Sequence, residues 1–201
     1  MQKSYTQRKG FTLVELLIVI GILAILATVT VLVLNPAQLF AQARDSQRVS
    51  DLGTLNSALA YYLSTASTTD LDGSTTDCST RCYVQTTGLT GNGCAGAGTA
   101  RHGAKTVTID ADRTVDSLGW IPVYIGGAVG GSPISVLPVD PTNTTTYFYS
   151  YACDNTNKTY ELDANLESAR YIQDGSDDKE STDGGNVPTL FELGTDPGLD
   201  L

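Results

Sequence analysis

An uninterrupted apolar segment near the N-terminus limits what this chain can fold into more than any other feature. No charged residue occurs between Leu16 and Ala43, and residues 16–34 are nearly all leucine, isoleucine, valine and alanine. As a helix rising about 1.5 Å per residue, this stretch spans roughly 28 Å, close to the thickness of a bilayer core. A cleavable secretory signal has a shorter apolar part, about 7 to 15 residues. The sequence therefore predicts a membrane-spanning helix.

The charges around this segment predict its orientation. Lys3, Arg8 and Lys9 precede it without any acidic residue, which favours a cytoplasmic N-terminus and an exported C-terminal part. The chain has 12 basic and 22 acidic residues, so residues 11–201 carry 9 basic and 22 acidic side chains, a net charge of −13. Such an acidic chain is not a general nucleic-acid binder, and any contact with DNA would have to be local.

Glu15 is a carboxylate at the very start of the apolar segment. An ionised side chain costs about 2.5–3.5 kcal/mol at the middle of a membrane helix and less near the interface. One interpretation is an acid that simply lies in the headgroup layer. The alternative comes from its context, in which Gly10 and Phe11 follow Lys9 and lead into Glu15.

The stretch GFTLVELLIVIGILAILA, residues 10–27, resembles the processing site of bacterial type IV prepilins and of type II secretion pseudopilins. The resemblance implies cleavage between Gly10 and Phe11 by a prepilin peptidase, and N-methylation of Phe11. It also implies that Glu15 pairs with the N-terminal amine of a neighbouring subunit. A charge pair in a low dielectric is strongly favoured over two unpaired charges, so Glu15 would set the stagger between subunits.

Helical periodicity continues beyond the membrane segment. Apolar side chains at three- and four-residue steps predict one stripe that packs on a folded domain; they are Leu39, Val49, Leu52, Leu55, Leu59 and Tyr62 or Leu63. Pro36 interrupts this run, because it removes a backbone donor and crowds the preceding turn. Either a kink near residues 32–36 or a plain helix boundary is expected there.

Residues 64–104 are rich in Ser, Thr, Gly and Asp and predict a long loop with little regular structure. Cys78, Cys82 and Cys94 lie in this loop, and an exported domain favours disulfides, with Cys153 paired to one of the three. A zinc site built from these cysteines and His102 is the alternative, which the cysteine spacing disfavours.

Short strands are expected at residues 106–110, 121–125 and 134–137, followed by a hairpin of residues 147–153 and 159–163. Tyr147, Tyr149 and Tyr151 share one face of the first hairpin strand, and core packing is favoured over a binding platform. The fold class is α+β, a long N-terminal helix on a small antiparallel sheet with a disulfide-tied loop, which is also the pilin fold. Residues 137–141 resemble the proline-and-aspartate loop before the last hairpin of many pilins.

The C-terminal residues 172–201 contain eight acids and one lysine. Asp174, Asp177 and Asp178 are candidate calcium ligands, and the resemblance to pseudopilins points the same way. Their spacing does not match an EF-hand loop, so a solvated loop is the favoured interpretation and no cofactor is expected. The apolar residues 190–193 are expected to pack back on the domain.

Together these features predict five segments: a leader (1–10), a membrane and filament-core helix (11–35), an amphipathic helix (36–64), a globular head (65–171) and an acidic segment (172–201). The expected function is that of a filament subunit and not an enzyme, since no phosphate-binding loop or catalytic constellation is evident. The resemblance implies self-assembly and, as partners, the prepilin peptidase, an inner-membrane assembly platform and its ATPases. The precursor would lie in the membrane and the filament at the cell surface, serving adhesion, motility or secretion. A secretion pseudopilin and a non-polymerising anchored domain are the alternatives.

Overall fold

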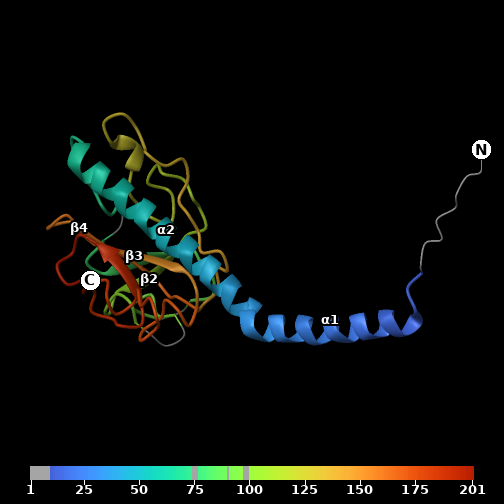
Figure 1. The fold of residues 1–201 in the computed structure, drawn as a ribbon. Coiled ribbons are helices and arrows are strands. Elements are labelled where there is room, and N and C mark those ends of the chain that lie inside the picture. Colours follow the sequence, from blue (N-terminus) through green and yellow to red (C-terminus); the bar gives the residue numbers. More distant parts are fainter. Residues whose placement is uncertain (1–9, 74–76, 90, 97–99) are drawn as a thin grey trace, which may run out of the picture. The chain divides into compact units, whose positions relative to one another are not determined.

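The computed structural model describes residues 10–73, 77–89, 91–96 and 100–201. The chain forms two compact units, divided between Phe40 and Ala41. Helix α1, Leu13–Leu34, belongs to the first unit (Figure 1). Helix α2, Pro36–Thr65, begins in the first unit and contributes its residues from Ala41 onward to the second.

The two helices are separated at Asn35. This residue adopts the left-handed conformation (φ 39°, ψ 75°), which asparagine tolerates better than most side chains, and it caps α1. Pro36 then starts α2, where its missing amide hydrogen costs nothing because the first amides of a helix have no intrahelical partner. Of the two outcomes that the sequence left open, the structure therefore has a helix boundary.

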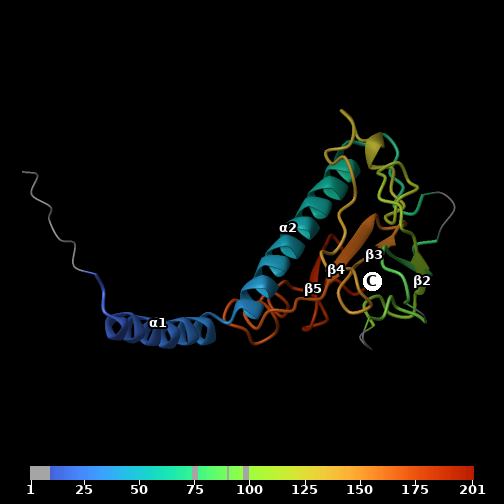
Figure 2. The same cartoon turned by 90° about the vertical axis from the view of Figure 1, so that its right-hand side faces the viewer.

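The second unit is α2 packed on one five-stranded sheet, so the predicted α+β layout is confirmed. The strands are β1 (Arg81–Val84), β2 (Thr106–Ile109), β3 (Tyr149–Asp154), β4 (Thr159–Ala164) and β5 (Phe191–Gly194), in the spatial order β2-β1-β3-β4-β5. All neighbours pair antiparallel except β1 and β2, which are parallel. Figures 1 and 2 both show α2 alongside the sheet.

The main core lies between α2 and one face of the sheet. The predicted stripe is confirmed for Leu52, Leu55, Leu59 and Tyr62, which are buried, whereas Leu39 is half exposed. From the sheet, alternate residues of β3 and β4 face the helix, since Tyr151 pairs with Leu162 across the ladder. This single-sided burial follows from the two-residue period of a strand.

The tyrosines of the hairpin pack in this core, as expected for the favoured interpretation. Tyr149 and Tyr151 are buried, and their hydroxyls donate to Asp51 Oδ2 at 2.9 Å and to the carbonyl of Leu71 at 3.0 Å. Tyr147 differs, because it precedes β3 and is only half-buried. It lies under the guanidinium of Arg48, outside the main core. The hydroxyls thus join the helix and the loop to the sheet.

Two predicted strands are wrong. Residues 121–125 are buried except for Tyr124, but they run as an irregular segment that ends in the short 3-10 helix η1, Ile125–Gly127. Pro122 lacks the amide that a ladder needs, so apolar residues here pack without pairing. Residues 134–137 are likewise irregular, with only Leu137 fully buried, and prolines at 133 and 138 flank them.

Two strands arise where no strand was expected. β1 lies inside the polar segment 64–104, where the sequence predicts a long loop with little regular structure, and this four-residue strand is a regular element that the prediction did not place. β5 comes from the acidic C-terminal segment, whose apolar residues return to the sheet beside β4, as the prediction that they pack back required. Four-residue strands are stabilised mainly by the neighbour that they pair with, which sequence alone does not reveal.

The four cysteines form two disulfides. Cys78 bonds to Cys153 in β3, and Cys82 in β1 bonds to Cys94. The first connects the segment after α2 to the centre of the sheet, and the second closes the loop between β1 and β2. Because every cysteine is in a disulfide, the alternative of a cysteine zinc site is wrong.

A buried arginine fixes the start of α2 in the second unit to two loops. Arg48 donates from Nε and Nη2 to both carboxylate oxygens of Asp140, at 2.7 and 3.0 Å. Its Nη1 donates to Asp45 Oδ1 at 2.8 Å and to Glu167 Oε1 at 2.6 Å. Glu167 also accepts from Arg44. The aspartate of the segment 137–141 is therefore the counter-ion of a buried helix residue.

Candidate processing and assembly site

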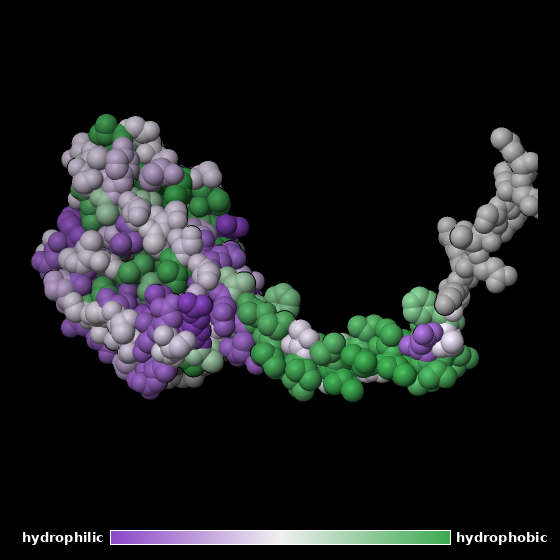
Figure 3. Space-filling view, in the orientation of Figure 1, coloured by the Kyte–Doolittle hydropathy of each residue, from purple (hydrophilic) through white to green (hydrophobic). Residues whose placement is uncertain are grey.

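The surface of α1 is apolar on every side. None of its residues is buried, and its large apolar side chains are 47–80% exposed. Figure 3 shows hydrophobic side chains covering this helix along its length. By length and composition, the N-terminal helical stretch is able to cross a membrane. A helix that is hydrophobic all round requires lipid or other helices around it.

A capping box starts α1 at the carboxylate that the sequence marked as unusual. Thr12 is the N-cap, and its hydroxyl accepts from the backbone amide of Glu15 at 3.2 Å. In return Glu15 Oε2 accepts from the amide and from the hydroxyl of Thr12, both at 2.8 Å. The signal for this motif, Thr-x-x-Glu before an apolar run, is in the sequence and was missed. Glu15 therefore has a local partner as well as the proposed intermolecular one.

The expected cleavage position is open. Gly10 is exposed, and a Cβ added to it would meet no atom within 4 Å. The side chain of Phe11 is 88% exposed. Packing of the described residues therefore gives no reason for a glycine at position 10. The basic residues Lys3, Arg8 and Lys9 lie outside the described residues.

A comparison with protein families identifies this segment. Residues 5–31 match the family model described as the prokaryotic N-terminal methylation motif. The chain carries the signature of type IV prepilins. With the apolar helix, the prepilin motif fits a precursor anchored in the membrane. No curated protein and no solved structure matches the chain, so residues 32–201 are interpreted from their own structure.

The candidate calcium ligands do not converge. Asp177 contacts Arg170 and Lys179, at 3.2 and 3.1 Å. Asp178 instead accepts from the amides of Asp174 and Ser181, each at 2.9 Å. Among the described residues, these acids do not form a group with the spacing of metal ligands. The carboxylates of Asp177 and Asp178 are thus occupied by contacts within their own loop.

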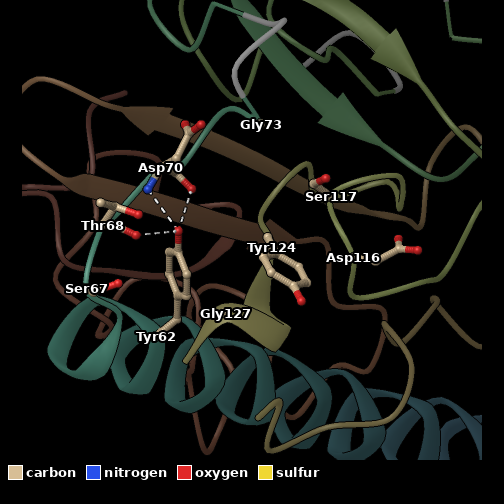
Figure 4. Close-up of a pocket in the computed structure, with 9 residues that line it drawn as sticks. All are labelled: Tyr62, Ser67, Thr68, Asp70, Gly73, Asp116, Ser117, Tyr124 and Gly127. Atoms are coloured by element: carbon tan, nitrogen blue, oxygen red, sulfur yellow. Dashed lines mark hydrogen bonds between the residues drawn. The ribbon is translucent and has the colours of Figure 1, made fainter. Parts of the chain in front are cut away.

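A hollow lies beside the C-terminal end of α2 (Figure 4). Its lining comes from the helix end and two loops; the residues are Tyr62, Ser67, Thr68, Asp70, Gly73, Asp116, Ser117, Tyr124 and Gly127. The Tyr62 hydroxyl accepts from the amide of Asp70 at 2.9 Å and lies 3.3–3.4 Å from the carbonyls of Thr68 and Asp70. Among the described residues, this lining contains no histidine, lysine or cysteine, which are common bases and nucleophiles.

Sequence reasoning also missed a cluster of ionisable side chains on the face of the sheet that points away from α2. His102 is brought beside Glu161 and Asp163 of β4, and all three are buried. The alternation in residues 160–163, Tyr-Glu-Leu-Asp, places both acids on the face opposite Tyr160. That part was readable from the sequence, but the arrival of His102 was not.

Proposed function

We propose that the chain is the structural subunit of a type IV filament, and not an enzyme. The precursor crosses the inner membrane once through α1, with residues 1–10 in the cytoplasm and the second unit outside. A prepilin peptidase cleaves between Gly10 and Phe11, and the new terminus at Phe11 is methylated. An assembly platform and its ATPases then move the subunit into a filament at the cell surface, without a cofactor.

The observation that carries this proposal is the combination of the methylation motif with a helix that has no buried residue. The remaining apolar surface of α1 has to be covered after the subunit leaves the lipid. Packing against the same helix of other subunits covers it, because such helices are apolar on every side. An anchored domain that never polymerises would keep α1 in lipid permanently.

The capping box supports a specific role for Glu15 in assembly. Cleavage after Gly10 removes neither Thr12 nor Glu15, so the cap survives in the mature chain. Both hydrogen bonds to Thr12 use Oε2, and among the described residues no hydrogen bond uses Oε1. Oε1 is therefore available for the amine of Phe11 in a neighbouring subunit, a pair that is favoured where water is excluded.

Two substitutions separate this role from helix capping. Glu15→Val removes the carboxylate, whereas Thr12→Ala removes the cap hydroxyl and leaves the carboxylate in place. We expect Glu15→Val to be processed at Gly10 but to give few filaments, and Thr12→Ala to assemble nearly as wild type. Sheared filaments are counted by electron microscopy, and processing is followed by intact mass. Equal filament yields from Glu15→Val and wild type would refute the pairing.

A further inference from the structure

The cluster around His102 has the composition of a metal site. Nδ1 of His102 lies 3.6 Å from Glu161 Oε1, and Nε2 lies 3.2 Å from Asp163 Oδ2. One potential ligand atom from each of the three residues lies within 4.8 Å of the other two. Imidazole nitrogen and carboxylate oxygen together are a typical donor set for zinc and related divalent ions.

The buried polar atoms of this cluster lack partners. His102, Glu161 and Asp163 are each 0% exposed. Both ring nitrogens of His102, Glu161 Oε1 and Asp163 Oδ1 have no hydrogen-bond partner among the described residues. Leaving a buried polar group unpaired destabilises the fold, and the effect is larger for a charged group. Something that the protein itself does not supply is expected to satisfy them.

The nearest cations do not fill this need. Arg101 donates to the carbonyl of Phe148 at 2.9 Å and to Ser150 Oγ at 3.2 Å, and its guanidinium stacks on the Phe148 ring at 3.6 Å. Lys105 donates to the carbonyl of Cys78 at 2.7 Å. Glu192, paired opposite Asp163 on β5, adds another buried carboxyl to the same face. Neither Arg101 nor Lys105 donates to the carboxylate of Glu161 or Asp163, and Arg101 reaches only the main-chain carbonyl of Asp163, at 3.4 Å.

The loop that carries His102 is held in place independently of the cluster. Gly93 accepts from the amides of Arg101 and His102, at 2.9 and 3.1 Å, and the adjacent Cys94 is bonded to Cys82 in β1. Gly93 has a φ of 73°, and a Cβ there would collide with the carbonyl of Gly103. The backbone of His102 is therefore held in place without any ligand, as a preorganised site requires.

A hollow lies on the surface beside His102. Its lining is His102 together with residues of the β1–β2 region and Leu201. The amide of Leu201 donates to Glu161 Oε2 at 2.9 Å, which orients that carboxylate and leaves Oε1 for another partner. An oriented ligand is one feature that a functional metal site needs.

We propose that His102, Glu161 and Asp163 bind one zinc-like divalent transition-metal ion, which joins the β1–β2 loop to β4. Each residue gives one ligand atom, and water from the hollow completes the tetrahedron. Metal–ligand bonds of about 2.0–2.2 Å require the side chains to move slightly inward. Burial, followed by the nearby charges of Arg101 and Lys105, lowers the pKa of His102 well below its ordinary value.

Metal binding to the full-length chain in detergent micelles tests this proposal. The chain is stripped with a chelator, incubated with zinc sulfate, separated by gel filtration and analysed for zinc by mass spectrometry. We expect about one zinc per wild-type chain and a rise in Tm of about 5–10 °C at a hundredfold excess over Kd. Glu161→Gln and Asp163→Asn should bind almost none, while Asp178→Asn, in the exposed acidic loop, should bind as wild type.

The isosteric substitutions keep the test decisive, because each removes a buried charge and so favours folding. Their circular dichroism and melting without metal establish that they are folded. Cobalt provides a second readout, since His102→Gln should abolish the visible absorption of a tetrahedral cobalt site. Wild type that binds no zinc, or Asp163→Asn that binds as much as wild type, overturns the proposal. A buried imidazolium between the carboxylates would instead be indicated if both isosteres lowered the Tm without metal.

Discussion

Replacing Asp140 with alanine should destabilise the second unit strongly, although the residue is far from the N-terminal motif in sequence. Its carboxylate accepts two hydrogen bonds from Arg48, whose side chain is 0% exposed. The same carboxylate accepts from the amide of Thr142 at 2.8 Å and from the amide of Asn143 at 3.2 Å. One truncation therefore removes a counter-ion and the hydrogen bonds that shape a loop.

The magnitude follows from what remains around the guanidinium. Breaking a buried ion pair by removing one partner costs about 3–5 kcal/mol, because the other charge stays buried. Because Arg48 keeps its hydrogen bonds to Asp45 and Glu167, we expect the free energy of unfolding to fall by about 3 kcal/mol. For a chain of this size, each kcal/mol lowers the Tm by about 2–4 °C, so the Tm should fall by about 6–12 °C.

Differential scanning calorimetry of the full-length chain in detergent measures this change. Asp200→Ala is the matched control, since Asp200 is exposed and its loss should change stability by less than about 0.5 kcal/mol. If Asp140→Ala lowered the Tm no more than this control, Arg48 would not depend on Asp140. The ion-pair account of how α2 is attached would then be wrong.

Two further predictions concern the same unit. Because 75 residues separate Cys78 from Cys153 but only 12 separate Cys82 from Cys94, removing the first disulfide should cost more. Chain entropy predicts a loss of about 4.5 kcal/mol for removing Cys78–Cys153 and about 2.8 kcal/mol for removing Cys82–Cys94. Each disulfide is removed by replacing both of its cysteines with serine, and equal losses of Tm in the two variants would contradict the prediction. Burial acts to raise the pKa of Asp140, but the hydrogen bonds and charge of Arg48 prevail and lower it. The stability that comes from a lowered carboxyl pKa is present above the pKa of the unfolded chain, about 3.9, and is lost as pH falls through the pKa of the folded chain. The urea midpoint should therefore fall more steeply with acid in wild type than in Asp140→Asn. Identical slopes of urea midpoint against pH would refute this.

The sequence was most informative where one period or one composition dominates. The apolar run predicted α1, and alternating tyrosines predicted the hairpin of β3 and β4, including its core face. Local signals failed where an apolar segment is packed in the core without the hydrogen bonds of a sheet. Residues 121–125 are the example, because Pro122 prevents strand pairing there. Local signals also failed for β1 and β5, whose four residues form strands because of the neighbours they meet.

The functional residues divide in the same way. Thr12 and Glu15 form a local motif that a sequence can reveal, since the cap and its partner are three residues apart. His102 and Glu161 are far apart in the chain and meet only because β1, β3 and β4 are neighbours in the sheet. The pair of Arg48 and Asp140 could not be predicted for the same reason. A charged residue on a helix is expected to be solvent-exposed unless its buried counter-ion is known.

The central claim is that this chain is processed at Gly10 and built into a filament through the new terminus. Mass spectrometry of sheared surface material and of membranes tests it most directly. The account predicts an abundant N-terminal peptide that begins at methylated Phe11 in the sheared filaments. The same peptide confined to membranes would favour a secretion pseudopilin, and an intact terminus that retains Lys9 and Gly10 would contradict the filament account.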